Sequence, residues 1–422
     1  MGTRWAAVMA LAVGMSSGAS AADLGGNCCV DLEERIAELE ATTARKGNRK
    51  VSLEVSGWIN KTMLFWDDSV RKDVYIGIDN DAAQSRFRFV GSATISPDVT
   101  AGFLYEFGAL GALTSTVNQT NGGDDRPLNS QRLRHANAWI ESKRLGRVTL
   151  GLASQATDGI AEIDLSRSEV VAGSNVDSWI ESFRLVVNCG YSTRVGIDIF
   201  SGNQDGGRDQ LIRYDSPTLA GFRLSASISG GTIYPQDAIG TLPTGPERQE
   251  WDIALRYANE FNGVRFAAGI GYHEGTILDT GNATFQFNKT VTGSAAFLHV
   301  PSGLFLTLAA GRREYDEATS IAGAVDTYVY AKTGVLANLT PFGQTSIYGE
   351  YFQQWTKVDT VPPILFPGED YDAKVWGAGI VQHIDAAAME VYLAYRYYDS
   401  PSLVGQDFGD FHMMQAGARI RF

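Results

Sequence analysis

Apolar and polar residues alternate along most of this chain, and the alternation is clear in its last twelve residues. Between Phe411 and Phe422, every second side chain is apolar, while the residues between them include Arg419 and Arg421. Successive side chains of a β-strand point to opposite faces. The segment therefore predicts a strand with one apolar face and one polar, positively charged face.

The same period recurs along the chain and predicts sixteen strands. An even number is expected of a bacterial outer-membrane barrel made from one chain, in which apolar side chains face lipid and polar ones face the lumen. The expected strands are 51–66, 84–96, 98–109, 132–144, 146–153, 208–216, 221–230, 249–260, 263–274, 288–299, 303–316, 326–338, 342–357, 373–384, 387–399 and 411–422.

The segments between these strands alternate in length, which favours a membrane barrel over a soluble β-protein. Short turns on one rim and long loops on the other are typical of outer-membrane barrels. We expect short links at 97–98, 145–146, 217–221, 261–263, 301–303, 340–343 and 385–386. The expected long links are 67–83, 110–131, 154–207, 231–248, 275–287, 317–325, 358–372 and 400–410.

The sequence thus predicts an all-β fold, a 16-stranded antiparallel transmembrane β-barrel. A barrel of this size leaves an aqueous lumen unless something obstructs it. The obvious obstruction is the third long link, 154–207, because loops of that length are usually functional or disordered. We expect a short helix at 156–168, with Ile160, Ile163 and Leu165 on its apolar side.

The N-terminal residues do not share the strand pattern. Residues 1–22 contain a basic residue, an apolar run and a small-residue segment, which predicts a signal peptide for export. We expect residues 23–50 to form a helical prefix on the periplasmic side; the helix is predicted because Leu32, Ile36 and Leu39 recur at helical spacing. The prefix either pairs with its copies as a short coiled coil or packs on nothing. The barrel domain is 51–422.

Composition narrows the partners. The formal net charge of -13 argues against a nucleic-acid partner, which would need a basic face. After the signal peptide, no apolar run is long enough for a transmembrane helix. The three cysteines, Cys28, Cys29 and Cys189, match no zinc or haem spacing. We therefore expect no cofactor and no metal.

Three segments make the chain resemble the trimeric outer-membrane porins, in particular the alphaproteobacterial type. They are Ile212-Arg-Tyr-Asp-Ser-Pro-Thr-Leu-Ala-Gly-Phe222, Val51-Ser-Leu-Glu-Val-Ser-Gly-Trp-Ile-Asn60 and the terminal Phe422. The resemblance covers the mature chain apart from the prefix. It implies a Gram-negative outer-membrane location, a homotrimer in outer-membrane lipid, and a third loop that folds into each barrel and narrows it.

Opposed charges across the narrowed lumen would orient solutes and set charge preference. Strand alternation places a set of arginines on the lumen face, and the long loop supplies carboxylates. Each arginine could equally form only local pairs on the wall. The candidate constriction residues are Asp158, Glu162 and Asp164 in the loop and Arg213, Arg223, Arg256 and Arg265 on the wall.

Other functions remain open alternatives. A barrel-borne hydrolase would need a catalytic motif, but the five histidines are scattered, and no G-x-S-x-G or H-E-x-x-H is present. A sugar- or phosphate-selective channel is closer, although only Tyr392 and Tyr398 are predicted as inward aromatics. A plugged receptor or adhesin would need a larger plug than the prefix. We conclude that the sequence predicts a porin without enzymatic activity, for passive diffusion of small hydrophilic solutes and ions.

Overall fold

The computed structural model describes residues 50–108, 111–123, 132–187, 190–191, 200–232, 247–279, 284–317, 324–358, 370–403 and 406–422. The predicted signal peptide and helical prefix lie outside these residues, as do all three cysteines. No helix in the described ranges is long and apolar enough to cross a membrane.

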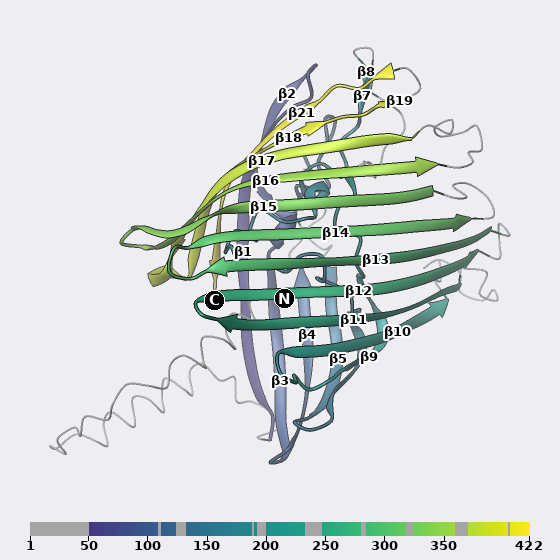
Figure 1. The fold of residues 1–422 in the computed structure, drawn as a ribbon, viewed down its shortest axis with the longest axis vertical. Coiled ribbons are helices and arrows are strands. Elements are labelled where there is room, and N and C mark those ends of the chain that lie inside the picture. The colour runs from purple at the N-terminus through teal and green to yellow at the C-terminus, as the bar shows by residue number, and fades with distance from the viewer. Residues whose placement is uncertain are drawn as a thin grey trace.

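One large antiparallel sheet closes on itself as a barrel (Figure 1). The first strand, β1, pairs with the last, β21, from Trp58–Arg421 to Asp67–His412, and this pairing closes the barrel. The strands of the sheet are β1 (Ser52–Asp67), β2 (Lys72–Asp79), β3 (Arg86–Ser96), β4 (Val99–Gly108), β5 (Arg132–Ser142), β6 (Gly146–Ser154), β9 (Arg208–Asp215), β10 (Phe222–Thr232), β11 (Glu247–Phe261), β12 (Val264–Asp279), β13 (Thr284–His299), β14 (Leu304–Glu317), β15 (Ala324–Thr340), β16 (Gly343–Val358), β17 (Tyr371–Ile384), β18 (Met389–Asp399) and β21 (Phe411–Arg421).

These seventeen strands occupy sixteen positions in the wall, because β2 and β3 share one side of β1. The second half of β1 pairs with β2 and its first half with β3. The short 3-10 helix η1 (Asp81–Ala83) interrupts the two. The prediction of sixteen strands is confirmed, but the predicted long link 67–83 is wrong. A tight turn at 68–71 leads directly into β2.

The link between β12 and β13 is also shorter than predicted. The ladder between these strands continues to Asp279–Thr284, so only four residues separate them instead of the predicted 275–287. The predicted helix at 156–168 is wrong as well, because this segment forms turns and bends. A 3-10 helix, η2 (Val176–Trp179), follows later in the same loop.

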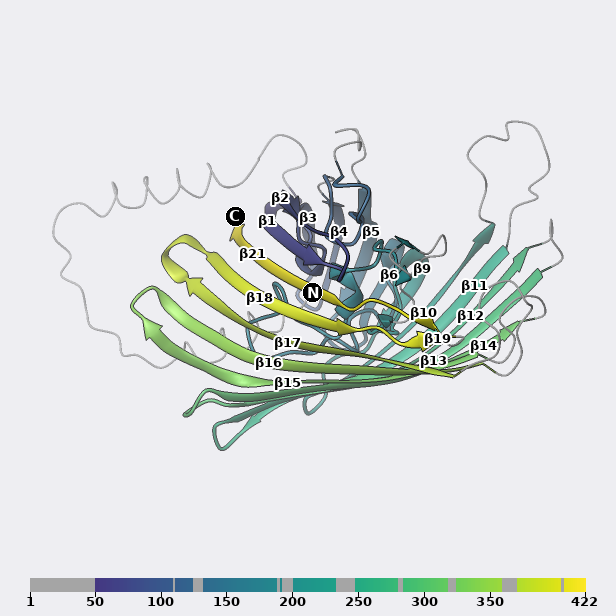
Figure 2. The same cartoon turned by 90° about the horizontal axis from the view of Figure 1, so that it is seen from above.

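Burial alternates along the strands as the barrel requires. On β11, Ile253 and Leu255 are each 41% exposed, whereas the alternate residues Asp252 and Ala254 are each 1% exposed. An apolar outer face suits lipid, and the polar residues face inward. Seen from above, β11–β18 form a broad curved wall, and β1–β6 lie on the other side (Figure 2).

The third long loop packs against the inner face of the broad wall. Its apolar side chains Val176, Trp179 and Phe183 are at most 1% exposed, and they belong to one hydrophobic cluster with wall residues. Those wall residues include Tyr328, Tyr330, Phe352, Tyr398, Phe411 and Met413. The described part of the loop thus fills the lumen beside β14–β18.

Candidate functional site

The loop is held to the wall where it begins. Arg213 of β9 donates from Nη1 to the carbonyl oxygens of Ser154 and Gln155, at 3.1 and 2.9 Å. Arg256 of β11 donates to the carbonyls of Ala156 and Asp158, at 2.8 and 3.0 Å. These predicted wall arginines therefore bind the loop backbone.

The next part of the loop lies on glycines of β12. A Cβ atom on Gly269 would lie 2.5 Å from Cδ1 of Ile160 and 2.8 Å from Cδ1 of Ile163. Ser294 of β13 donates to the Ile160 carbonyl at 2.6 Å. The strand glycines thus make room for the loop's apolar side chains close to the wall.

A buried ion pair fixes the middle of the loop. Nζ of Lys332 on β15 lies 2.7 Å from Oδ2 of Asp164, and their side chains are 0% and 9% exposed. Thr307 also donates to Asp164, at 2.8 Å. Burial alone would raise the pKa of Asp164, but the Lys332 ammonium and the Ser166 hydrogen bonds lower it below its ordinary value. Asp164 therefore anchors the loop.

The far part of the loop is fixed by a second buried pair. Arg396 of β18 forms an ion pair with Glu350 of β16, with Nε 2.7 Å from Oε1 and both side chains at most 2% exposed. The Arg396 guanidinium also donates to the carbonyls of Gly173 and Val176 and lies 4.6 Å from the centre of the Trp179 ring. The loop is therefore held to the barrel wall at four places along its length.

Across the lumen, we call six of the arginines on the wall from β21 to β9 the arginine arc. Three of them, Arg86, Arg88 and Arg134, converge on the single carboxylate of Glu106 on β4. Arg208 of β9 lies beyond them, and Arg419 and Arg421 of β21 complete the arc.

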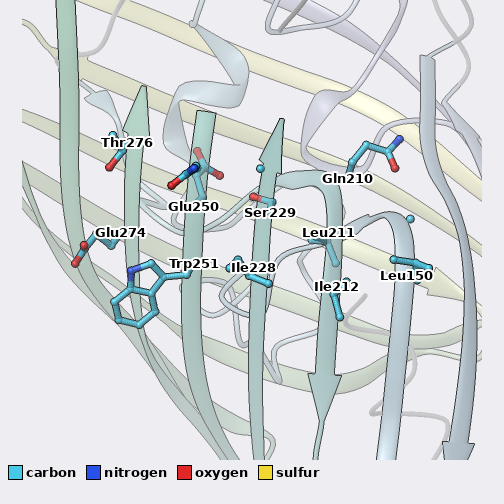
Figure 3. Close-up of a pocket in the computed structure, with 13 residues that line it drawn as sticks. Leu150, Gln210, Leu211, Ile212, Ile228, Ser229, Glu250, Trp251, Glu274 and Thr276 are labelled. Carbon is cyan, nitrogen blue, oxygen red and sulfur yellow. The ribbon is translucent and has the colours of Figure 1, made fainter. Parts of the chain in front are cut away.

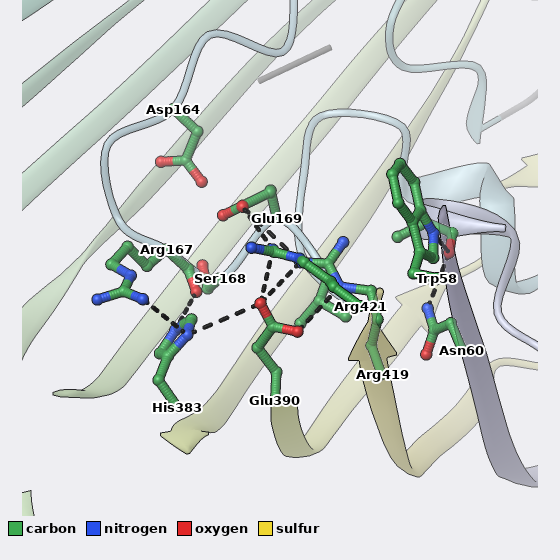
Figure 4. Close-up of polar contacts among 12 residues, drawn as sticks. Trp58, Asn60, Asp164, Arg167, Ser168, Glu169, His383, Glu390, Arg419 and Arg421 are labelled. Atoms are coloured by element: carbon green, nitrogen blue, oxygen red, sulfur yellow. Dashed lines mark hydrogen bonds and ion pairs between the residues drawn. The ribbon is translucent and has the colours of Figure 1, made fainter. Parts of the chain in front are cut away.

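Arg419 and Arg421 both pair with Glu390 of β18, at 3.1 and 2.6 Å, and both lie 4.0 Å from Glu169 of the loop (Figure 4). Next to them, Trp58 faces inward and donates from Nε1 to the Ala83 carbonyl at 3.1 Å. The two groups of arginines in the arc therefore meet beside this ring.

Three carboxylates of the loop, Asp158, Glu162 and Asp205, lie close to one another, and we call them the acidic edge. Asp158 lies 3.8 Å from Arg208, and the side chain of Asp205 accepts from the Ala161 backbone N–H at 3.3 Å. Desolvation by the surrounding protein and the neighbouring Asp158 carboxylate raise the pKa of Glu162 to about 7, although its side chain is exposed. Burial also raises the pKa of Asp205 well above its ordinary value, and the neighbouring Glu162 and Asp158 add to the shift.

The predicted site residues thus fall into separate places. Asp158 and Glu162 lie on the acidic edge of the loop, whereas Asp164 is buried with Lys332. Arg223 of β10 lies opposite Arg256 of β11 in the ladder of these two strands. Arg265 donates a hydrogen bond from Nε to Oε2 of Glu260 at 2.8 Å, near the short turn between β11 and β12. Sequence reasoning missed the arc residues Arg86, Arg88, Arg134 and Arg208, although Arg86 and Arg88 show the period of a strand face.

The inward aromatics Tyr392 and Tyr398 are not free to line a passage. Tyr392 donates to the side chain of Asn60 at 2.8 Å, and Tyr398 donates to the Val176 carbonyl at 2.7 Å. They are 2% and 0% exposed. These two rings therefore belong to the packing beneath the loop.

A crevice of about 830 Å³ lies in the wall between β9 and β10 (Figure 3). The β9–β10 ladder runs only from Asp215–Ser225 to Leu211–Ser229, so the two strands separate beyond it. The exposed side chains of Ile212, Ile228 and Trp251 contribute to its lining. The buried, inward-facing Leu211, Ser229 and Glu250 line it as well, so the crevice is bordered by residues from both faces of the wall.

The described residues contain no group of three His, Cys, Asp or Glu side chains placed to hold a metal ion. Carboxylates on the loop and guanidiniums on the wall create a field across the space between them.

Comparison with known families agrees with this geometry. A sequence model described as Gram-negative porin matches residues 6–419. The chain belongs to the Gram-negative porin family. This membership identifies the barrel as an outer-membrane porin. A search of curated proteins returns no significant match.

Solved structures with the same fold include other outer-membrane proteins. The channel DcaP of Acinetobacter baumannii has a TM-score of 0.56 at 10% identity, covering 89% of this chain and 99% of its own. A loop L8 deletion mutant of OmpT, an outer membrane protein of Vibrio cholerae, has a TM-score of 0.54 at 14% identity, covering 88% and 100%. The anion-selective porin from Comamonas acidovorans scores 0.52 at 15% identity, with the same coverage.

Proposed function

We propose that this porin forms a water-filled channel for passive diffusion of small hydrophilic solutes and ions, without catalysis or a cofactor. The observation that carries the proposal is the opposition of the arginine arc to the acidic edge of the loop. Charged residues at such density suit an aqueous space and would be costly in a dry core. The loop fills the other side of the lumen, so solutes pass between the edge and the arc.

Two features would select among solutes. The bulk of the fixed loop limits their size. The field between carboxylates and guanidiniums orients dipolar solutes and acts on ions. In this proposal Asp158, Glu162 and Asp205 form the acidic side, and the arc forms the basic side. Arg213 and Arg256 act indirectly, because they position the loop.

The remaining assignments follow the family resemblance. We infer a trimer of the alphaproteobacterial type in outer-membrane lipid, with residues 1–22 removed on export and the short turns on the periplasmic side. The prefix 23–50 would lie beneath the barrel, where its apolar seam could join three chains as a coiled coil. Cross-linking of full-length protein and of a variant lacking 23–50 tests this role: loss of trimers only in the variant supports it, and unchanged trimers overturn it.

Single-channel recording in a planar bilayer tests the channel itself. Refolded protein should give ohmic conductance steps, and a trimer should close in groups of three. Stably folded protein that gives no conductance would overturn the proposal. Substitution of the acidic edge by Asp158→Asn and Glu162→Gln should change the reversal potential in a salt gradient while leaving the barrel folded.

A further inference from the structure

The barrel wall opens between β9 and β10, at the end of these strands away from their short turn. The ladder between them ends at Leu211–Ser229. Beyond that point β9 stays paired with β6 as far as Arg208, and β10 stays paired with β11 as far as Thr232. The crevice of about 830 Å³ lies in this opening (Figure 3). Its volume is in the range of pockets that hold small organic molecules.

The beginning of the long loop lies behind the crevice, on the lumen side. Gln155 of the loop donates from its side-chain nitrogen to Glu250, which lines the crevice. The side-chain oxygen of Gln155 accepts from the backbone N–H of Gly207, at the other end of the loop, at 2.8 Å. A ligand would therefore reach the crevice from the lipid side, where its apolar lining residues are exposed.

The lining changes from apolar to polar along the strands. Its apolar part consists of four side chains that are between 44% and 63% exposed: Leu150, Ile212, Ile228 and Trp251. Gln210 and Gln249 lie two residues from Ile212 and Trp251, on the same strand faces and nearer the long loops. Thr276 of β12 lies at the same end (Figure 3). The crevice therefore crosses the border between the apolar outer wall and its polar rim.

The polar part of the lining can form hydrogen bonds with a ligand. Ser229 is 5% exposed, and its hydroxyl has no hydrogen-bond partner among the described residues. A buried hydroxyl without a partner carries a cost that a ligand group could remove. The described lining offers amide, hydroxyl and carboxylate groups but no lysine or arginine. Such groups suit the hydroxyls of a ligand, whereas a phosphate would call for a guanidinium or an ammonium.

We propose that the crevice binds one glycolipid molecule. Its sugar head group would contact Gln210, Gln249 and Ser229, and its acyl chain would lie along Ile228 and Trp251. An indole ring suits this border, because it has an apolar body and a polar tip. Bulk lipid offers a chain the same apolar contact as the wall does, so the head group supplies the selectivity. The bound chain would fill the opening between the strands, in front of the beginning of the loop.

Native mass spectrometry of the refolded full-length protein tests the site. The protein is kept in tetraethylene glycol monooctyl ether and titrated with dodecyl maltoside, which has a sugar head group and a hydrocarbon chain. One maltoside should be retained per barrel. Dodecylphosphocholine has the same chain and a phosphate head group, and it should bind about tenfold more weakly, the effect of one to two neutral hydrogen bonds. Equal or stronger retention of dodecylphosphocholine, or retention of neither amphiphile, overturns the proposal.

Three variants locate the bound molecule. Ile228→Trp fills the crevice with a larger apolar side chain and should abolish retention of the maltoside. Ile270→Trp makes the same change at an exposed position of β12 outside the lining and is the matched control. Gln249→Ala should weaken binding of the maltoside about fivefold, as for one neutral hydrogen bond, and leave dodecylphosphocholine unaffected.

Heat-modifiable migration on a gel identifies folded barrels of each variant. Unchanged retention in folded Ile228→Trp, or an equal loss in Ile270→Trp, would place the molecule elsewhere on the wall and contradict the proposal. Equal weakening of both amphiphiles by Gln249→Ala would contradict recognition of the sugar.

Discussion

Lys332 and Asp164 join the barrel wall to the loop through a buried ion pair, with Nζ 2.7 Å from Oδ2. The same ammonium donates to Ser168 and to the Ala172 carbonyl, at 3.0 and 3.2 Å. One wall side chain therefore binds three points of the loop. Its loss would leave a buried carboxylate without its counter-charge.

Lys332→Met should release the middle of the loop from the broad wall. Removing one partner of a buried pair typically costs about 3–5 kcal/mol, and here the cost falls on loop docking because the strand ladder is unchanged. We expect noisier single-channel current and faster proteolysis within 155–187. Lys374→Met removes an exposed lysine that pairs with Asp372 and serves as the control. The double variant Lys332→Met/Asp164→Asn should recover part of the loss, and failure to do so would argue against the ion pair.

The charge of the acidic edge should depend on pH. Since the pKa of Glu162 is raised to about 7, this side chain is largely neutral at pH 6 and ionised at pH 8. Asp158 and Asp205 face the same group, and Arg208 and Arg86 act on it in the opposite direction. Raising the pH across this range adds negative charge and should shift the reversal potential toward cation preference. Glu162→Gln should reduce the shift, and an equal shift in this variant would assign it to another group.

The glycines under the loop should tolerate no large side chain. Gly269→Leu places atoms where Ile160 and Ile163 now lie, so the loop must move away from β12 into the lumen. We therefore expect smaller single-channel conductance from a barrel that still folds. A Cβ on Gly349 of β16 would meet a single atom of the described residues within 4 Å, the Gly377 carbonyl oxygen at 3.9 Å, so Gly349→Leu is the matched control. Unchanged conductance in Gly269→Leu would show that the loop does not limit the passage.

The strands could be predicted because each is defined by its own local alternation. The exception, β2, shows the limit of that signal. Gly77, with φ of +75°, lies at a bulge where Thr62 pairs with Ile78 and Met63 with Ile76. The bulge shifts the alternation by one residue, so the segment does not read as a regular strand. A short element interrupted by a bulge is therefore easily assigned to a loop.

The site was predicted only in outline, because it depends on the path of the loop in space. Carboxylates at 158 and 162 were proposed from residue type alone, and their neighbours on the wall come from strands far away in sequence. Nothing local distinguishes Asp164, which pairs with Lys332, from Asp158, which faces Arg208. The alternate arginines at 86 and 88 lie within the strand predicted at 84–96, and their period of two was a local signal for one strand face.

The seam that closes the barrel should not accept a larger residue at Gly57. Gly57 of β1 and Phe422 exchange two backbone hydrogen bonds, at 2.9 and 3.0 Å. A Cβ on Gly57 would overlap the Arg86 carbonyl oxygen and lie 2.8 Å from the Phe422 ring, so the backbone must shift on both sides of β1. Gly57→Val should cost about 1–3 kcal/mol, a typical penalty for overpacking, and reduce the yield of folded barrel. Gly349→Val, in open space, controls for loss of a glycine. Equal yields of heat-modifiable protein from the two variants would show that this seam accommodates a side chain.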